Sequence, residues 1–389
     1  MHLSNIISYI CIHIMAGLYI HIPFCASRCI YCGFYSTTQL SQQDRYVDAL
    51  CREMELRPLS SDLSPLTSVY LGGGTPSQLS PKNLERLFLY ISKVYGDNLG
   101  AIEVTMECNP DDVTQGFVET LRRLPVNRVS LGAQTFSDER LRFLHRRHSA
   151  SQVKKAVARL RGAGIGNISI DLMFGFPGET LESWAEDIAE ALKLDVEHIS
   201  AYSLMYEEGT PLMELIRKGE AGCEDVTDEE LSRAMYELLI DRMEAAGYEH
   251  YEISNWARAG FRSRHNSSYW QGIPYIGIGA AAHSFDVKTR SWNVSDLRSY
   301  MEAIEQGTLP SESETLDDRT RYNDLVTTAL RTRDGIALST LSQHRRHFLL
   351  ENAGVSLRAG LLRLEQDHLS LTRQGLFVSD AVMADLIDV

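Results

Sequence analysis

Short apolar segments alternate with longer amphipathic segments from Leu18 to about Ile253. The short segments are rich in β-branched residues, which favour strands, and the longer ones repeat apolar residues with the 3.6-residue period of a helix. The predicted strands are Leu18–Pro23, Ser68–Gly73, Ile102–Glu107, Arg128–Gln134, Asn167–Phe174 and His198–Leu204. The predicted helices are Asp44–Leu56, Pro81–Val94, Thr114–Leu124, Ser151–Ala163, Leu181–Leu194 and Asp228–Ala246.

Strands that alternate with helices predict βαβ units, in which right-handed crossovers join parallel strands. Six such units are two short of a complete (β/α)8 barrel. We therefore expect an α/β fold built on a partial (β/α)6 TIM-like barrel over residues 15–255.

Polar residues or glycines follow each predicted strand at its carboxyl end, which is where chemistry collects in barrels of this kind. They are the loop that contains Cys25, Gly72 to Pro76, Glu107 to Pro110, Gln134, Asp171 and Tyr202. Because the ends of parallel strands lie on one side of a barrel, this succession indicates a shared site.

The pattern changes beyond about residue 290, after a connecting segment over residues 256–290. Helices are predicted over Tyr300–Gln306, Asp317–Arg331, Gly335–Gln343 and Phe348–Ala359, followed by a hairpin and a last helix, Ala381–Ile387. This predicts a small, mainly helical, winged-helix-like C-terminal domain over residues 291–389. Winged folds often bind DNA, but this one is acidic and has no basic recognition helix, so we expect no nucleic-acid partner.

Composition narrows the class of protein. The 389 residues are 44% hydrophobic and carry a net charge of −14, which argues against a duplex-binding surface.

Residues 1–14 contain an apolar run that is interrupted by histidines and too short to span a membrane, so we expect them to be an extension outside the fold. Four scattered cysteines are expected to be buried free thiols in a reducing compartment: Cys11, Cys51, Cys108 and Cys223.

Three further cysteines, Cys25, Cys29 and Cys32, follow the first predicted strand with the spacing C-x-x-x-C-x-x-C. Iron–sulfur clusters are ordinarily held by four thiolates, so three indicate a cubane with one iron open to a small molecule. A zinc site with His21 as fourth ligand is the alternative, but such sites usually contain a second pair of ligands, which is missing.

The segment GGGTP, residues 72–76, follows the second predicted strand. Glycine has no Cβ, so the backbone here could approach a ligand closely, although a tight turn is the simpler explanation when the segment is considered alone. The pattern is not that of a P-loop.

Together, the cysteine triplet and GGGTP resemble the radical S-adenosylmethionine (SAM) superfamily. The segments YIHIPFC, GGGTPS, GAQTF and DLMFGFPGET, with the C-terminal hairpin, resemble its coproporphyrinogen III dehydrogenase (HemN)-like family from Met15 onward. The resemblance implies that the triplet binds a [4Fe-4S] cluster, whose open iron is chelated by SAM. It implies contacts near the cluster or SAM for Tyr19, Tyr31, Gly73, Gly74, Thr75, Glu107, Gln134, Arg146 and Asp171.

Two departures point to the haem chaperone (HemW) branch of that family. The dehydrogenases carry another cysteine two residues after the third, where this chain has Phe34, and only about 18 residues precede the first predicted strand. His265 to Trp270 also resembles the branch's H-N-x-x-Y-W signature. Haem iron accepts a neutral imidazole and aromatic rings pack on porphyrins, so haem contact at His265 is expected, with other ligands such as His283 left open.

The resemblance therefore implies a cytoplasmic haem chaperone that binds [4Fe-4S], SAM and haem and delivers haem to respiratory and other haem proteins. It leaves open a homodimer and transient contact with membrane-bound respiratory enzymes. The alternative is an enzyme that converts coproporphyrinogen III to protoporphyrinogen IX without oxygen, against which Phe34 argues.

Overall fold

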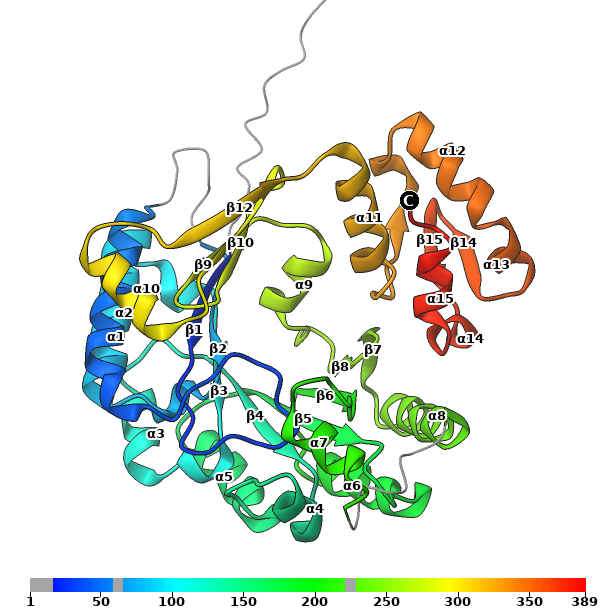
Figure 1. Ribbon diagram of the computed structural model, residues 1–389. Helices are drawn as coiled ribbons and strands as arrows, with labels where there is room; N and C mark the ends of the chain where they lie inside the picture. The colour runs from blue at the N-terminus through cyan, green and yellow to red at the C-terminus, as the bar shows by residue number, and fades with distance from the viewer. Residues whose placement is uncertain (1–16, 59–65, 221–228) are drawn as a thin grey trace, which may run out of the picture.

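The computed structural model describes residues 17–58, 66–220 and 229–389 (Figure 1). The predicted extension over residues 1–14, with Cys11, Cys223 and Asp228, lies outside the described residues. The six predicted strands form β1 (Gly17–Ile22), β2 (Ser68–Gly73), β3 (Glu103–Cys108), β4 (Arg128–Gln134), β5 (Asn167–Phe174) and β6 (His198–Ser203). The helices between and after them are α1 (Gln43–Leu56), α2 (Pro81–Tyr95), α3 (Gln115–Leu121), α4 (Asp138–Phe143), α5 (Ala150–Gly162), α6 (Leu181–Lys193), α7 (Pro211–Arg217) and α8 (Glu229–Ala245).

Strands β1 to β6 are parallel and adjacent in chain order, with connecting helices on the outside of the curved sheet (Figure 1). The predicted partial barrel is therefore confirmed. Helices α4 and α7 were not predicted; each has only six or seven residues, too few to display a clear helical period. No helix in the described ranges is long and apolar enough to cross a membrane.

Alternating side chains give the barrel two different faces. In β1, Leu18, Ile20 and Ile22 are fully buried and belong to the hydrophobic core that includes α1 and α2. The residues between them are polar and face inward, as expected from the two-residue period of a strand. Polar residues on the inward face are hydrogen-bonded across strands: Tyr70 to Glu107, Ser130 to Asp171 and Ser169 to His198. The barrel thus encloses a polar interior.

The sheet continues beyond both edges of the barrel, which the sequence did not predict. On the β6 side it adds β8 (Asn255–Ala257) and β7 (Glu249–Glu252). On the β1 side, β9 (Tyr275–Ile278) pairs parallel with β1, followed by antiparallel β10 (His283–Phe285), β11 (Thr289–Asn293) and β12 (Ser311–Thr315). Helix α9 (Arg264–Trp270) contacts β2, while α10 (Leu297–Glu305) packs on α1. The division at residues 255 and 290 remains a prediction, although the sheet runs through both positions.

The C-terminal part forms a second hydrophobic core around a three-stranded sheet. Its elements are α11 (Asp318–Ala329), β13 (Ile336–Ala337), α12 (Gln343–Asn352), α13 (Gly354–Arg358), β14 (Leu362–Glu365), β15 (His368–Leu371), α14 (Arg373–Leu376) and α15 (Ser379–Ala384). The winged-helix-like prediction is confirmed. The predicted helix Gly335–Gln343 is wrong: Gly335 has a φ of +65°, and Ile336 pairs with Leu369 before a short 3-10 turn, Leu338–Thr340.

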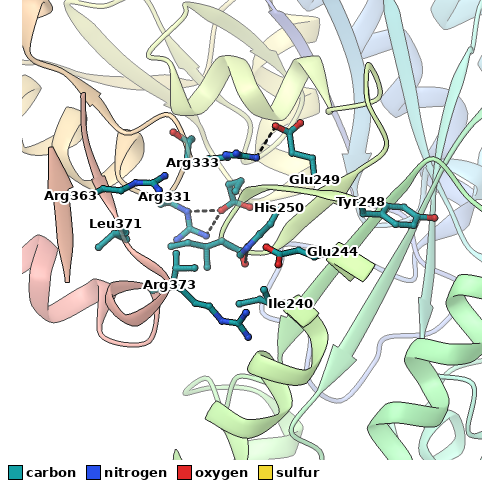
Figure 2. Close-up of a pocket in the computed structure, with 14 residues that line it drawn as sticks. Ile240, Glu244, Tyr248, Glu249, His250, Arg331, Arg333, Arg363, Leu371 and Arg373 are labelled. Carbon is teal, nitrogen blue, oxygen red and sulfur yellow. Dashed lines mark hydrogen bonds and ion pairs between the residues drawn. The ribbon is translucent and has the colours of Figure 1, made fainter. Parts of the chain in front are cut away.

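The C-terminal part meets the barrel at a cleft of about 410 Å³ (Figure 2). Backbone hydrogen bonds cross it from Ile253 to Arg331 and from Arg333 to Tyr251. The guanidinium of Arg331 donates to Glu252 over 2.9 and 3.1 Å and lies over the Trp270 ring. The Glu252 side chain is 0% exposed, so this ion pair neutralises a carboxylate removed from water.

We expect Arg331→Met to destabilise the protein by about 2–3 kcal/mol, because it leaves the buried Glu252 carboxylate without its cation. Arg346→Met removes an exposed pair with Asp367 and should cost less than about 1 kcal/mol. Urea unfolding followed by circular dichroism measures both changes. Equal losses in the two variants would contradict the bridging role of Arg331.

Candidate functional site

The three cysteines lie on a loop anchored directly after β1. Phe24 is buried in the core, and the backbone N–H of Cys25 donates to the Thr37 carbonyl over 2.9 Å. All three thiols are free and partly exposed. Cys25 Sγ lies 3.4 Å from Thr75 Oγ1, and Arg146 donates to Cys29 Sγ over 3.4 Å. Burial raises the pKa of the Cys25 and Cys32 thiols. The loop thus presents three accessible sulfurs at the carboxyl end of β1.

The glycine turn after β2 packs against the base of this loop. Gly73 has a φ of +108°, and a Cβ there would lie 2.4 Å from the His21 ring. A Cβ on Gly74 would lie 2.7 Å from the Pro23 backbone. The N–H groups of Gly74 and Thr75 donate to the carbonyls of Ile22 and Phe24. Side chains would therefore disrupt the close approach that brings Thr75 beside Cys25.

Glu107 lies next to this turn, on the inward face at the end of β3. Its carboxylate accepts hydrogen bonds from Tyr70 over 2.7 Å and from the Gly73 N–H over 3.1 Å. Burial raises the pKa of Glu107 to about 7, against the opposing effect of the Tyr70 hydrogen bond. Burial thus favours the neutral, protonated form of Glu107, whereas a cationic group beside it would favour the ionised form.

Arg146 joins the cysteine loop to the ends of β3 and β4. Besides Cys29, its guanidinium donates to the Asn109 side chain and, over 2.7 Å, to the Gly132 carbonyl. Its Nε is buried and has no hydrogen-bond partner among the described residues. Tyr31 lies close enough to Arg146 and Cys29 to interact electrostatically with both. Arg146 is therefore placed to meet an anionic group beside the cysteine loop.

Gln134 and Asp171 complete the group on the neighbouring strands. Gln134 has a φ of +65° at an irregularity between β4 and β5, which a non-glycine residue rarely adopts. Asp171 accepts from Ser130, and burial raises the pKa of its carboxyl. Tyr19 lies on β1, with its hydroxyl 3.1 Å from His21 Nδ1. The strand ends thus bring the predicted SAM residues to one edge of the barrel, while their contacts with SAM remain predictions.

Sequence reasoning did not assign several polar residues that organise this edge, chiefly Tyr70, Asn109 and Ser130. The signal that could have found them is the strict alternation of polar and apolar residues along the strands.

His21, considered in the sequence as a fourth zinc ligand, has its ring nitrogens 3.1 Å from Tyr19 Oη and 3.0 Å from the Tyr35 carbonyl. Across the described residues, no three His, Cys, Asp or Glu side chains are grouped closely enough to hold a single metal ion. His21 would have to give up one of its two contacts to bind a metal ion.

The motif His265 to Trp270 forms helix α9, which lies against the inner face of the sheet. Glu103 accepts from the N–H groups of Arg264 and His265, and Ser263 caps the helix. The His265 ring is 0% exposed. Its Nδ1 lies 2.8 Å from Ser68 Oγ and its Nε2 lies 2.7 Å from the Tyr269 hydroxyl. These contacts are those of a packed structural histidine, so ligation of haem iron would require one of them to break.

The comparisons with known proteins agree with this architecture. The profile of the radical SAM superfamily matches residues 19–191. The chain is 39% identical over 297 residues to "Heme chaperone HemW" of Bacillus subtilis, covering 76% of this chain and 78% of that protein. It is 36% identical over 376 residues to the Mycobacterium tuberculosis protein of the same name, covering 95% and 94%.

Among solved structures, the coproporphyrinogen III oxidase (HemN) of Escherichia coli, described as a radical SAM enzyme, superposes with a TM-score of 0.82. The match covers 96% of this chain and 90% of that one at 22% identity, so it shows a shared fold. Because the identity to the haem chaperones extends over most of both sequences, the chain belongs to the HemW family of haem chaperones in the radical SAM superfamily.

Proposed function

We propose that the protein is a cytoplasmic haem chaperone that binds a [4Fe-4S] cluster, SAM and haem and passes haem to haem-dependent proteins, including respiratory ones. The observation that carries this proposal is the similarity to haem chaperones along nearly the whole chain, at 36–39% identity. A homodimer and transient contact with membrane-bound respiratory enzymes belong to the same proposal.

The described residues fit the proposed cluster and SAM. Cys25, Cys29 and Cys32 are free thiols on one loop, and three thiolates leave one iron of a cubane without a protein ligand. When bound, the cluster would supply an electron that can cleave SAM. The glycine turn at Gly73 and Gly74 packs against the base of this loop, and Glu107 beside the turn offers a carboxylate to the polar atoms of SAM.

The alternative activity is oxygen-independent decarboxylation of coproporphyrinogen III. Phe34 stands where enzymes of that type carry an additional cysteine, and its side chain is 71% exposed two residues after Cys32. A phenyl ring can neither ligate iron nor transfer a proton. This position argues against the dehydrogenase activity, whereas the fold shared with HemN is compatible with either function.

The test is a haem titration of the anaerobically reconstituted full chain, followed by absorbance. We expect saturable binding of about one haem per chain, with a Kd of about 1 μM or lower. A parallel incubation with coproporphyrinogen III, SAM and a reductant should yield no protoporphyrinogen IX. Absence of saturable haem binding would refute the chaperone proposal, and product formation would establish the alternative.

A further inference from the structure

Strand β9, which is parallel to β1, and the antiparallel strands β10 and β11 beyond it extend the inner face of the barrel. Gly17 pairs with Tyr275 and Tyr19 with Gly277, so these residues of β1 and β9 share a face. Tyr275 pairs in turn with Phe285 of β10. His283 lies two residues before Phe285 and directly opposite Trp292 of β11. His283 and Trp292 therefore project from the face that carries Tyr19 and the polar interior.

This extension is continuous with helix α9 through a row of aromatic rings. Tyr269 of α9 lies 4.6 Å from Tyr275, and Tyr275 lies 6.3 Å from Phe285, measured between ring centroids. His283 lies 6.1 Å from Trp292, with 30° between the ring planes. Gly277 lies between Tyr19 and His283 and has no side chain; a Cβ there would lie 1.9 Å from the carbonyl oxygen of His283, so the His283 backbone packs closely over Gly277. The glycine thus lets β10 approach β9 closely at His283, beside the flat rings of Phe285 and Trp292.

His283 differs from the other histidines on this face because its ring is free to bind a ligand. Its side chain is exposed, and no hydrogen bond to its ring is found among the described residues. His21, His198 and His265 have both ring nitrogens within hydrogen-bond distance of a partner. Partial burial, with Arg290 nearby, lowers the pKa of His283, so its imidazole is neutral at pH 7. A neutral, unengaged imidazole is the form that binds haem iron.

We propose that His283 is the axial ligand of haem, and that the porphyrin lies against the face formed by Phe285 and Trp292. Helix α9 forms the neighbouring wall, with Tyr269 and Tyr275 linking it to the porphyrin surface. One protein ligand leaves the opposite side of the iron open to a ligand from the protein that receives the haem. This inference rests on the proposed function and adds the residue that holds the iron.

The experiment titrates haem into the full chain as wild type, His283→Ala and His344→Ala, the last removing an exposed histidine of α12 in the C-terminal part. We expect His283→Ala to bind at least about tenfold more weakly with a shifted Soret band, and His344→Ala to match the wild type. In His283→Gly, added imidazole should restore the wild-type Soret position by occupying the vacated space. Circular dichroism checks that each variant is folded.

Three results would overturn the assignment in different ways. Wild-type affinity and spectrum in His283→Ala would exclude His283 and leave the chaperone proposal standing. Weakened binding that imidazole does not rescue, with an unchanged spectrum, would show that His283 acts only through packing. Absence of haem binding by the wild type would remove both this assignment and the proposed function.

Discussion

Replacing Cys29 with alanine is expected to abolish assembly of the iron–sulfur cluster. The chain supplies three closely spaced thiols, so removing one leaves two, too few to retain a cubane whose fourth iron already lacks a protein ligand. Cys29 is also the thiol that accepts a hydrogen bond from Arg146, so its loss removes that link between the loop and the ends of β3 and β4. SAM binding that depends on the open iron should disappear with the cluster.

Iron and sulfide content after anaerobic reconstitution, together with broad absorbance near about 400 nm, measures this loss. Cys51→Ala is the matched control, because Cys51 is a buried free thiol in α1 and belongs to the hydrophobic core. The control should retain wild-type iron and sulfide. Full cluster content in Cys29→Ala would contradict the assignment of the triplet, and colourless protein with one zinc per chain would revive the zinc alternative.

The barrel was predictable because its signals are local. Each predicted strand has alternating or continuous apolar residues, and its observed bounds agree within one residue at either end. The helices repeat apolar residues on the face that packs against the sheet, as in α2 with Leu84, Leu87 and Ile91. Two of the scattered cysteines, Cys51 and Cys108, are buried and free as predicted.

The extra strands were not predictable in the same way. β9 and β10 have four and three residues, and β9 is placed by pairing with β1, about 250 residues earlier in the chain. Such short segments have no reliable period of their own. The environment of His265 also depends on residues far away in the sequence. Its ring contacts Ser68 on β2, and its backbone N–H donates to Glu103 on β3. Sequence reasoning could identify the motif but not that its imidazole is buried and engaged.

Glu107→Gln is expected to change two properties of the protein in opposite directions at high pH. The SAM-free variant should be more stable than the wild type, and it should bind SAM more weakly. The pKa of Glu107 is about 7 in the folded protein and about 4.5 when the side chain is solvated. The folded state therefore holds this proton more tightly than the unfolded state. Its stabilising contribution is complete below about pH 4.5 and is lost as the pH rises through about 7. Above that, ionisation costs up to about 3 kcal/mol in the unliganded protein.

Glutamine removes this titration, so the variant should gain stability relative to the wild type between pH 5 and pH 8. At pH 5 it should be the less stable of the two, because the amide nitrogen that replaces one carboxyl oxygen cannot accept the hydrogen bond from Tyr70 or from the Gly73 N–H. Urea unfolding of the SAM-free chain at the two pH values measures the difference. Glu85→Gln, which removes an exposed partner of Arg123, should show no such crossover.

The same carboxylate makes SAM binding depend on pH in the proposed site, because a cationic ligand selects the ionised form of Glu107. From pH 6 to pH 8 the ionised fraction rises about tenfold, and wild-type affinity for SAM should rise with it. Glu107→Gln has no carboxyl group to ionise at this position. Any pH dependence of SAM binding that remains in the variant is therefore due to titration of SAM itself. Isothermal titration of reconstituted wild type and variant separates the two contributions. Identical pH profiles would show that Glu107 only positions the Gly73 turn, whereas a flatter profile with weaker binding in the variant would place its charge against SAM.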